Sequence, residues 1–83
     1  MTSELIDKFL SSPARTQKKV SIHFKQRKTV TGIFLRTDDY NELKSKNFWR
    51  IVADSKLEEF EKTKDNSLAR IYNGAEFTRL SDN

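Results

Sequence analysis

Two short runs of alternating or β-branched side chains, joined by a tight basic turn, constrain the fold of this chain more than any other feature. The run at about residues 20–24 alternates apolar and polar side chains, which is typical of a half-buried strand. A β-branched run at about residues 29–36 predicts a second strand. Gly32 lies inside this second run, where a missing side chain favours a sharp bend or a close backbone approach. The two runs therefore predict a bent hairpin, which is how small barrels begin.

An amphipathic helix is predicted ahead of the hairpin, at about residues 3–12. Thr2 or Ser3 can cap its start, and Pro13 ends it because proline disfavours helical geometry in the preceding residue. Its apolar residues fall on one face at helical spacing: Leu5, Ile6, Phe9 and Leu10. A helix this short is marginal alone, so we expect its apolar face to cover an open end or a face of the sheet.

Beyond the hairpin, an acidic and aromatic loop at residues 38–43 leads to three more predicted strands. These strands lie at about residues 48–53, 67–72 and 75–80. Trp49 is expected in the core, since aromatic side chains dominate the burial of small domains. Asn73-Gly74 predicts a two-residue hairpin turn between the last two strands. Residues 54–67 fit either a short helix or a charged pair of strands, and the sequence leaves both open.

One helix followed by five short strands predicts a mainly β fold, namely a strongly bent small barrel of the SH3 type. A chain of 83 residues has room for one core, so residues 1–83 are expected to form a single domain. Only 35% of the residues are apolar, so the interior must be thin. We therefore expect self-association to support its stability.

Positive charge is concentrated in the first half of the chain. No acidic residue lies between Asp7 and Asp38, and this interval carries eight basic residues: Lys8, Arg15, Lys18, Lys19, Lys25, Arg27, Lys28 and Arg36. A block of one sign and this length attracts a polyanion such as RNA. The alternative, equally open from sequence, is that basic residues only keep strand edges and turns soluble.

Composition argues against several classes of protein. The chain has no cysteine, which excludes a disulfide scaffold and a thiolate metal site. Its longest apolar run, residues 33–35, is far shorter than the roughly 20 residues that cross a membrane. The N-terminus lacks the basic start and apolar centre of a signal peptide. We expect a soluble cytoplasmic protein with no membrane contact.

No catalytic or cofactor motif is evident. The chain lacks a glycine-rich phosphate loop, a nucleophile elbow and a zinc motif. His23 is the only histidine, and we expect it to be a surface residue without a catalytic role. Asp38, Asp39 and Glu42 are carboxylates of the kind that bind divalent cations, but a solvated acidic loop is the stronger interpretation. The sequence predicts a protein that is not an enzyme and holds no cofactor or metal.

The order of helix, strands and landmarks resembles the Sm-like family, which includes the Sm and Lsm proteins and the bacterial RNA chaperone Hfq. In that family a helix precedes five bent strands, and a glycine in the second strand is followed by an aspartate and an aromatic residue. Gly32, Asp38 and Tyr40 stand at matching spacing. The family's second motif, a hydrophobic-Arg-Gly turn, is similar to Tyr72-Asn73-Gly74.

This chain departs from the family at the residues that would contact RNA bases. Asn41, Glu42 and Leu43 fall where Met, Asn and Leu are usual, so a carboxylate that only accepts hydrogen bonds replaces an amide that also donates. Asn73 in place of arginine removes a cation. The resemblance implies that Tyr40, Tyr72 and Asn73 line the RNA site, with an altered base pocket. An equally open alternative is that the Tyr40 hydroxyl anchors the loop.

The resemblance implies a ring-forming RNA-binding protein, such as an RNA chaperone or riboregulator. The residues expected to attract RNA are Arg15, Lys18, Lys19, Lys25, Arg27 and Lys28. Ring formation also has a physical basis, because the fourth and fifth strands are expected at the sheet edges, where unpaired backbone groups accept another strand. The alternative function is an SH3- or Tudor-like module that binds proteins or peptides through Tyr40, Trp49 and Tyr72 and does not bind nucleic acid.

Overall fold

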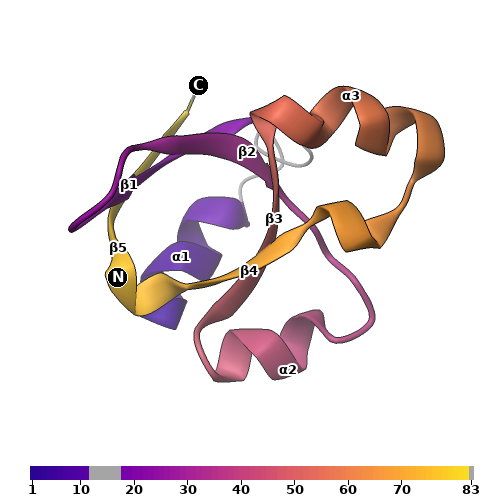
Figure 1. Cartoon of the computed structure of the whole chain (residues 1–83). Helices are drawn as coiled ribbons and strands as arrows, with labels where there is room; N and C mark the ends of the chain where they lie inside the picture. Colours follow the sequence, from indigo (N-terminus) through magenta and orange to yellow (C-terminus); the bar gives the residue numbers. More distant parts are fainter. Residues whose placement is uncertain (12–17, 83) are drawn as a thin grey trace.

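The computed structural model describes residues 1–11 and 18–82, and it has a mainly β fold with an N-terminal helix and a five-stranded antiparallel sheet (Figure 1). The strands are β1 (Val20–Phe24), β2 (Val30–Phe34), β3 (Phe48–Ala53), β4 (Arg70–Asn73) and β5 (Phe77–Asp82). The helices of the described part are α1 (Ser3–Leu10), α2 (Tyr40–Ser45) and α3 (Asp54–Thr63), with the 3-10 turns η2 (Asn66–Leu68) and η3 (Gly74–Glu76).

The strand order across the sheet is β4-β3-β2-β1-β5. The fourth and fifth strands therefore lie at the two edges, as the sequence predicts. Because no ladder joins β4 to β5 among the described residues, the sheet is open. The closed barrel is not confirmed and stays a prediction.

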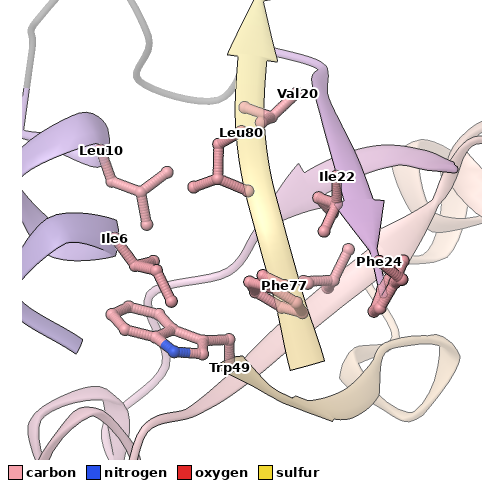
Figure 2. Packing of buried hydrophobic residues seen from close by; sticks show 9 residues of the cluster. Ile6, Leu10, Val20, Ile22, Phe24, Trp49, Phe77 and Leu80 are labelled. Atoms are coloured by element: carbon pink, nitrogen blue, oxygen red, sulfur yellow. The ribbon is translucent and has the colours of Figure 1, made fainter. Parts of the chain in front are cut away.

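The inner face of the sheet, meaning the face that packs on α1, holds the main core. Figure 2 shows Ile6 and Leu10 extending from α1 toward Trp49 and Leu80. The buried cluster consists of Ile6, Leu10, Val20, Ile22, Phe24, Trp49, Ile51, Phe77 and Leu80. Trp49 is only 1% exposed, which confirms its predicted place in the core. Leu5 is 54% exposed, because each helical residue is rotated by about 100° from the next and Ile6 takes the inward direction.

Gly32 lies where the backbones of β2 and β3 approach each other closely. A Cβ atom at Gly32 would be 2.3 Å from the carbonyl oxygen of Val52. Its φ angle is not positive, so the glycine is required by this approach and not by an unusual backbone conformation. The predicted role of Gly32 is confirmed.

The outer face of the sheet, opposite to α1, is covered only in part. Residues 54–63 form α3, which settles the alternative left open by the sequence in favour of a helix, and α3 packs on β2 and β3. Val52 and Leu57 are buried but stand outside the α1 cluster, as expected for a small second core beneath α3. The Glu58 and Lys62 side chains, which are four residues apart and so lie on one side of α3, form an ion pair at 3.5 Å.

The predicted hairpin turn at Asn73-Gly74 is wrong. The Asn73 side chain accepts a hydrogen bond from the N–H of Ala75 and begins η3, after which β5 crosses to the opposite edge of the sheet. The last strand consequently runs over residues 77–82 and not 75–80. A side chain that accepts from a backbone N–H nearby offers an alternative to strand pairing, and the Asn73 side chain stabilises the 3-10 turn η3 in this way.

Other predicted boundaries are also corrected. The strand expected at residues 67–72 begins only at Arg70, because the Asp65 side chain accepts from the N–H of Ser67 and starts η2. The loop expected at residues 38–43 becomes helical from Tyr40 onward. Two elements are shorter than predicted: α1 ends at Leu10, and β2 covers residues 30–34.

Candidate nucleic-acid interface

The turn between β1 and β2 presents three exposed cations at one end of the sheet. We call residues 25–28 the basic turn; its exposed cations are Lys25, Arg27 and Lys28. The backbone N–H of Lys25 donates to the carbonyl of Glu76 at 3.1 Å, so the basic turn lies against η3 (Figure 1). The fold therefore brings these cations beside the segment that joins β4 to β5.

Aromatic side chains adjoin the basic turn. The Arg27 guanidinium lies 5.3 Å from the centre of the Phe24 ring, in a cation–π contact. The Phe24 ring is 5.9 Å from the ring of Tyr72 and 5.2 Å from that of Phe77. Tyr72 is half-buried at this edge, so Tyr72 and the cations of the basic turn, predicted separately as RNA-binding residues, do come together.

Tyr40 is engaged inside the fold. Its hydroxyl donates to Asp7 Oδ1 on α1 at 3.2 Å, and its ring lies 5.9 Å from that of Trp49. The Arg36 guanidinium is 4.9 Å from the Tyr40 ring centre. Burial raises the pKa of Tyr40, and the bond to Asp7 acts in the same direction. These contacts favour the anchoring role for Tyr40 over base stacking.

The two residues at which the chain departs from the family motif do not converge. Asn73 uses its side-chain oxygen to accept from Ala75, as described above. Glu42 is exposed on α2 and pairs with Lys46 at 3.8 Å. No hydrogen bond or ion pair within the described part of the chain joins Glu42 to Asn73. A shared base pocket built from these two side chains has no support in the geometry.

Two of the predicted cations, Lys18 and Lys19, precede β1 and so lie at the opposite end of this strand from the basic turn. Lys19 pairs with Asp54, the first residue of α3, at 2.8 Å. Lys18 is exposed, and Arg15 lies outside the described residues. Lys19 and Lys25 flank opposite ends of β1, roughly 20 Å apart along an extended strand. The charge block that is continuous in sequence is therefore divided in space.

Sequence reasoning missed an ion pair on the outer face. Arg50 donates to both carboxylate oxygens of Asp39, at 2.7 and 3.3 Å, and the Thr37 hydroxyl donates to the same carboxylate. The hydrogen bond from Arg50, supported by Thr37, lowers the pKa of Asp39 to about 2. No local pattern relates an acid to an arginine eleven residues away, so no sequence signal was available.

This ion pair lines an open groove between the end of β2 and α3. Charges of both signs surround the groove, among them Asp38, Glu61 and Lys64. Since Arg50 is already neutralised by Asp39, the groove presents no excess charge that would select a ligand. We therefore assign no function to this groove.

Within residues 1–11 and 18–82, no group of three or more histidine, aspartate and glutamate side chains is placed to hold a metal ion. Asp39 and Glu42, two of the three carboxylates considered as ligands, instead pair with Arg50 and Lys46. None of the described helices has the length and apolar character needed to cross a membrane.

Comparison with known proteins adds no relative. No protein-family model matches the chain, and no significant match was found among curated proteins or solved structures. The Sm-like resemblance and the RNA partner therefore stay predictions, and only the geometry of this chain bears on its function.

Proposed function

We propose that this chain is an RNA-binding protein of Sm-like architecture, in which the basic turn attracts the phosphate backbone. The observation that carries the proposal is the placement of three exposed cations next to the Phe24–Tyr72 aromatic pair. Cations contribute affinity through phosphate contacts, and a partly exposed aromatic ring offers a base a surface for stacking. Tyr72 has such a partly exposed ring, and it lies beside the cations of the basic turn.

We further propose that copies of the chain assemble into a ring and complete their bent barrels through edge strands. β4 and β5 lie at opposite edges, which is the arrangement needed for head-to-tail pairing. Ile71 on β4 is 50% exposed, and this apolar side chain would gain burial from a neighbouring copy. A barrel closed within one chain would leave no such free edges.

RNA binding is tested by fluorescence anisotropy with labelled single-stranded oligonucleotides across a range of salt concentrations. A triple variant replaces the three cations of the basic turn by glutamine. A control variant makes the same change in three exposed lysines of α3 and its C-cap: Lys56, Lys62 and Lys64. Loss of three phosphate contacts is expected to reduce the slope of log K against log salt by about 2, whereas the control keeps the wild-type slope.

The two tyrosines separate base stacking from structural anchoring. Tyr72→Ala is expected to weaken RNA binding by about 1–3 kcal/mol, while Tyr72→Phe keeps the ring and the affinity. Tyr40→Phe removes the bond to Asp7 and is expected to lower stability without changing RNA affinity. An affinity loss in Tyr40→Phe equal to that of Tyr72→Ala would contradict this division.

Ring formation is tested by light scattering of the purified protein, which should give several times the monomer mass. A monomeric mass would remove the ring from the proposal and leave RNA binding to be decided separately. Absence of oligonucleotide binding at low salt would overturn RNA binding itself.

The alternative of an aromatic groove for peptides finds no support in the geometry. Its central residue, Trp49, is buried, and the indole N–H donates to the side chain of Asn47 at 2.8 Å. A peptide could reach this ring only after the core had opened. We therefore do not adopt the peptide-binding alternative.

A further inference from the structure

The outer face of the sheet beyond α3 is built from polar side chains of β2, β1 and β5. Two rows cross these strands, because residues directly opposite each other in the ladders share a face. The first row contains Thr31, Ser21 and Ser81, which are paired in register. The second contains Thr29, His23 and Arg79, where His23 and Arg79 are directly opposite. We call these six residues the polar face.

His23 connects the two rows through its ring nitrogens. Nε2 lies 3.3 Å from the Ser81 hydroxyl and 3.4 Å from Nη2 of Arg79. Nδ1 lies 3.3 Å from the Thr29 hydroxyl. When Nε2 accepts from Arg79, the ring proton resides on Nδ1 and can be donated to Thr29. The imidazole thus restrains the guanidinium against the strand.

Arg79 has no carboxylate partner in the described part of the chain. Its side-chain contact there is with Nε2 of His23, at 3.4 Å. A guanidinium has five N–H donors, and the contact with His23 uses one of them. The others remain for an anion, and the Ser81 hydroxyl lies 3.3 Å from the same imidazole nitrogen.

We propose that the polar face binds a phosphate of the RNA backbone, with Arg79 as the charged contact and His23 as the residue that positions it. The proposal rests on RNA binding by the basic turn and extends that site. Thr29 directly follows the basic turn in the chain, and His23 precedes Lys25 by two residues, which is about 7 Å along a strand. A backbone held by the turn can therefore continue across the sheet.

The chemistry of the polar face selects the backbone and not the bases. Its side chains are hydroxyl, imidazole and guanidinium groups, which commonly contact phosphate and sugar oxygens. Arginine binds phosphate bidentately, with a geometry that lysine cannot reproduce. The polar face has no apolar side chain for a helix or a peptide to bury. Binding here is therefore expected to be independent of RNA sequence.

The decisive variants are Arg79→Gln and Arg79→Lys, with Lys62→Gln on α3 as the control of equal charge. Arg79→Gln is expected to weaken single-stranded RNA binding about tenfold and to reduce the salt slope by about 0.7. Arg79→Lys is expected to keep the wild-type salt slope, because the positive charge remains. Its affinity is expected to lie between those of the wild type and Arg79→Gln, because the bidentate contact is lost. Circular dichroism melts establish that each variant is folded.

A nuclear magnetic resonance titration of the whole protein locates the contact. An eight-nucleotide single-stranded RNA is expected to shift the amide signals of residues 21–23, 29–31 and 79–81 as well as those of the basic turn. His23→Gln is expected to keep those shifts but to weaken binding less than Arg79→Gln, since His23 acts through Arg79.

The outcomes separate this inference from the proposed function. If the basic-turn variant loses RNA binding while Arg79→Gln matches Lys62→Gln, the polar face is not a phosphate site, although RNA binding stands. If the wild-type protein binds no RNA, both proposals fall. If hexaglutamate shifts the amides of the polar face and RNA does not, the face recognises an acidic peptide and the inference is overturned.

Discussion

The inner and outer faces of the sheet differ in how completely they are covered. The inner face packs on α1, and the two together form one cluster of nine buried side chains. The outer face is covered by α3 over β2 and β3, while the part over β1 and β5 carries the polar face. Most of the buried apolar side chains therefore lie on the inner side of the sheet, and the part of the outer face beyond α3 stays open to solvent.

This asymmetry separates stability from recognition. Side chains of the inner face cannot change without disturbing a close-packed core. Side chains of the polar face are exposed or only half-buried and do not belong to the buried core, so their substitution should alter binding more than folding. The four predictions below test this division, beginning with the largest expected effect.

Trp49→Ala is expected to reduce the free energy of unfolding by about 3–5 kcal/mol, because a large buried side chain leaves a cavity. Urea unfolding followed by circular dichroism measures the change, since this variant has no tryptophan left for fluorescence. His23→Ala on the polar face is the comparison, with an expected change within about 0.5 kcal/mol. Equal losses in the two variants would remove the distinction between the faces.

Leu57→Ala is expected to cost about 2 kcal/mol, less than Trp49→Ala, because Leu57 belongs to the smaller core beneath α3. The same urea titration measures it. Lys56→Ala, on the exposed side of α3, should change stability by less than about 0.5 kcal/mol. A loss at Leu57 as large as that at Trp49 would show that the outer face contributes as much stability as the inner face.

Gly32→Ala is expected to destabilise the fold by about 1–3 kcal/mol, because the added Cβ meets backbone that can move only with its strand. At Gly74 an added Cβ would come within 3 Å of side-chain atoms of Asn47, Ile6 and Trp49, of which Ile6 and Trp49 are buried in the main core. Gly74→Ala is therefore expected to destabilise the fold as well. Thermal melts measure both changes, and a Gly32→Ala variant as stable as the wild type would contradict the assigned role of Gly32.

Asp39→Asn is expected to have the smallest effect, and one that depends on pH. The folded-state pKa of Asp39, about 2, lies below its ordinary value of 3.8, so the Arg50 pair stabilises the fold fully above about pH 4. That stabilisation is lost as pH falls through about 2. The melting temperatures of wild type and variant should therefore differ at neutral pH and converge in acid. The exposed neighbour Asp38, changed to Asn, is the control and should show no such convergence.

The parts of the fold that could be predicted are those set by near neighbours in the chain. Alternating side chains located β1, and a run of mostly apolar residues located β3. Thr2 caps α1 by accepting from the N–H of Leu5, as predicted for threonine at this position. Predictions failed near Asp65 and Asn73, where a single side chain captured a backbone N–H and produced a 3-10 turn. A hairpin turn and a 3-10 turn capped by a side chain involve the same two residues, and the sequence pattern does not show which of them forms.

The candidate site was harder to predict because its contacts join distant segments. Tyr40 and Tyr72 both fit a stacking residue in sequence, yet Asp7 engages one of them and the basic turn adjoins the other. His23 was expected to be an isolated surface residue, and among neighbours in the chain it has no evident partner beyond Thr29. Ser81 and Arg79 lie more than fifty residues away and reach it only through the pairing of β1 with β5.

A short capped helix, the places of the β1–β2 hairpin and of β3, and an excess of positive charge in the first half of the chain all follow from the amino-acid sequence alone. These properties depend on periodicity, residue size and charge, which act within a few residues. The tertiary structure, in contrast, separates β4 from β5, which the sequence predicted to be joined by a hairpin turn, and it places Lys19 and the basic turn at opposite ends of β1. It also brought His23 and Arg79 together, because hydrogen bonds across a sheet are formed by register between strands and not by distance along the chain.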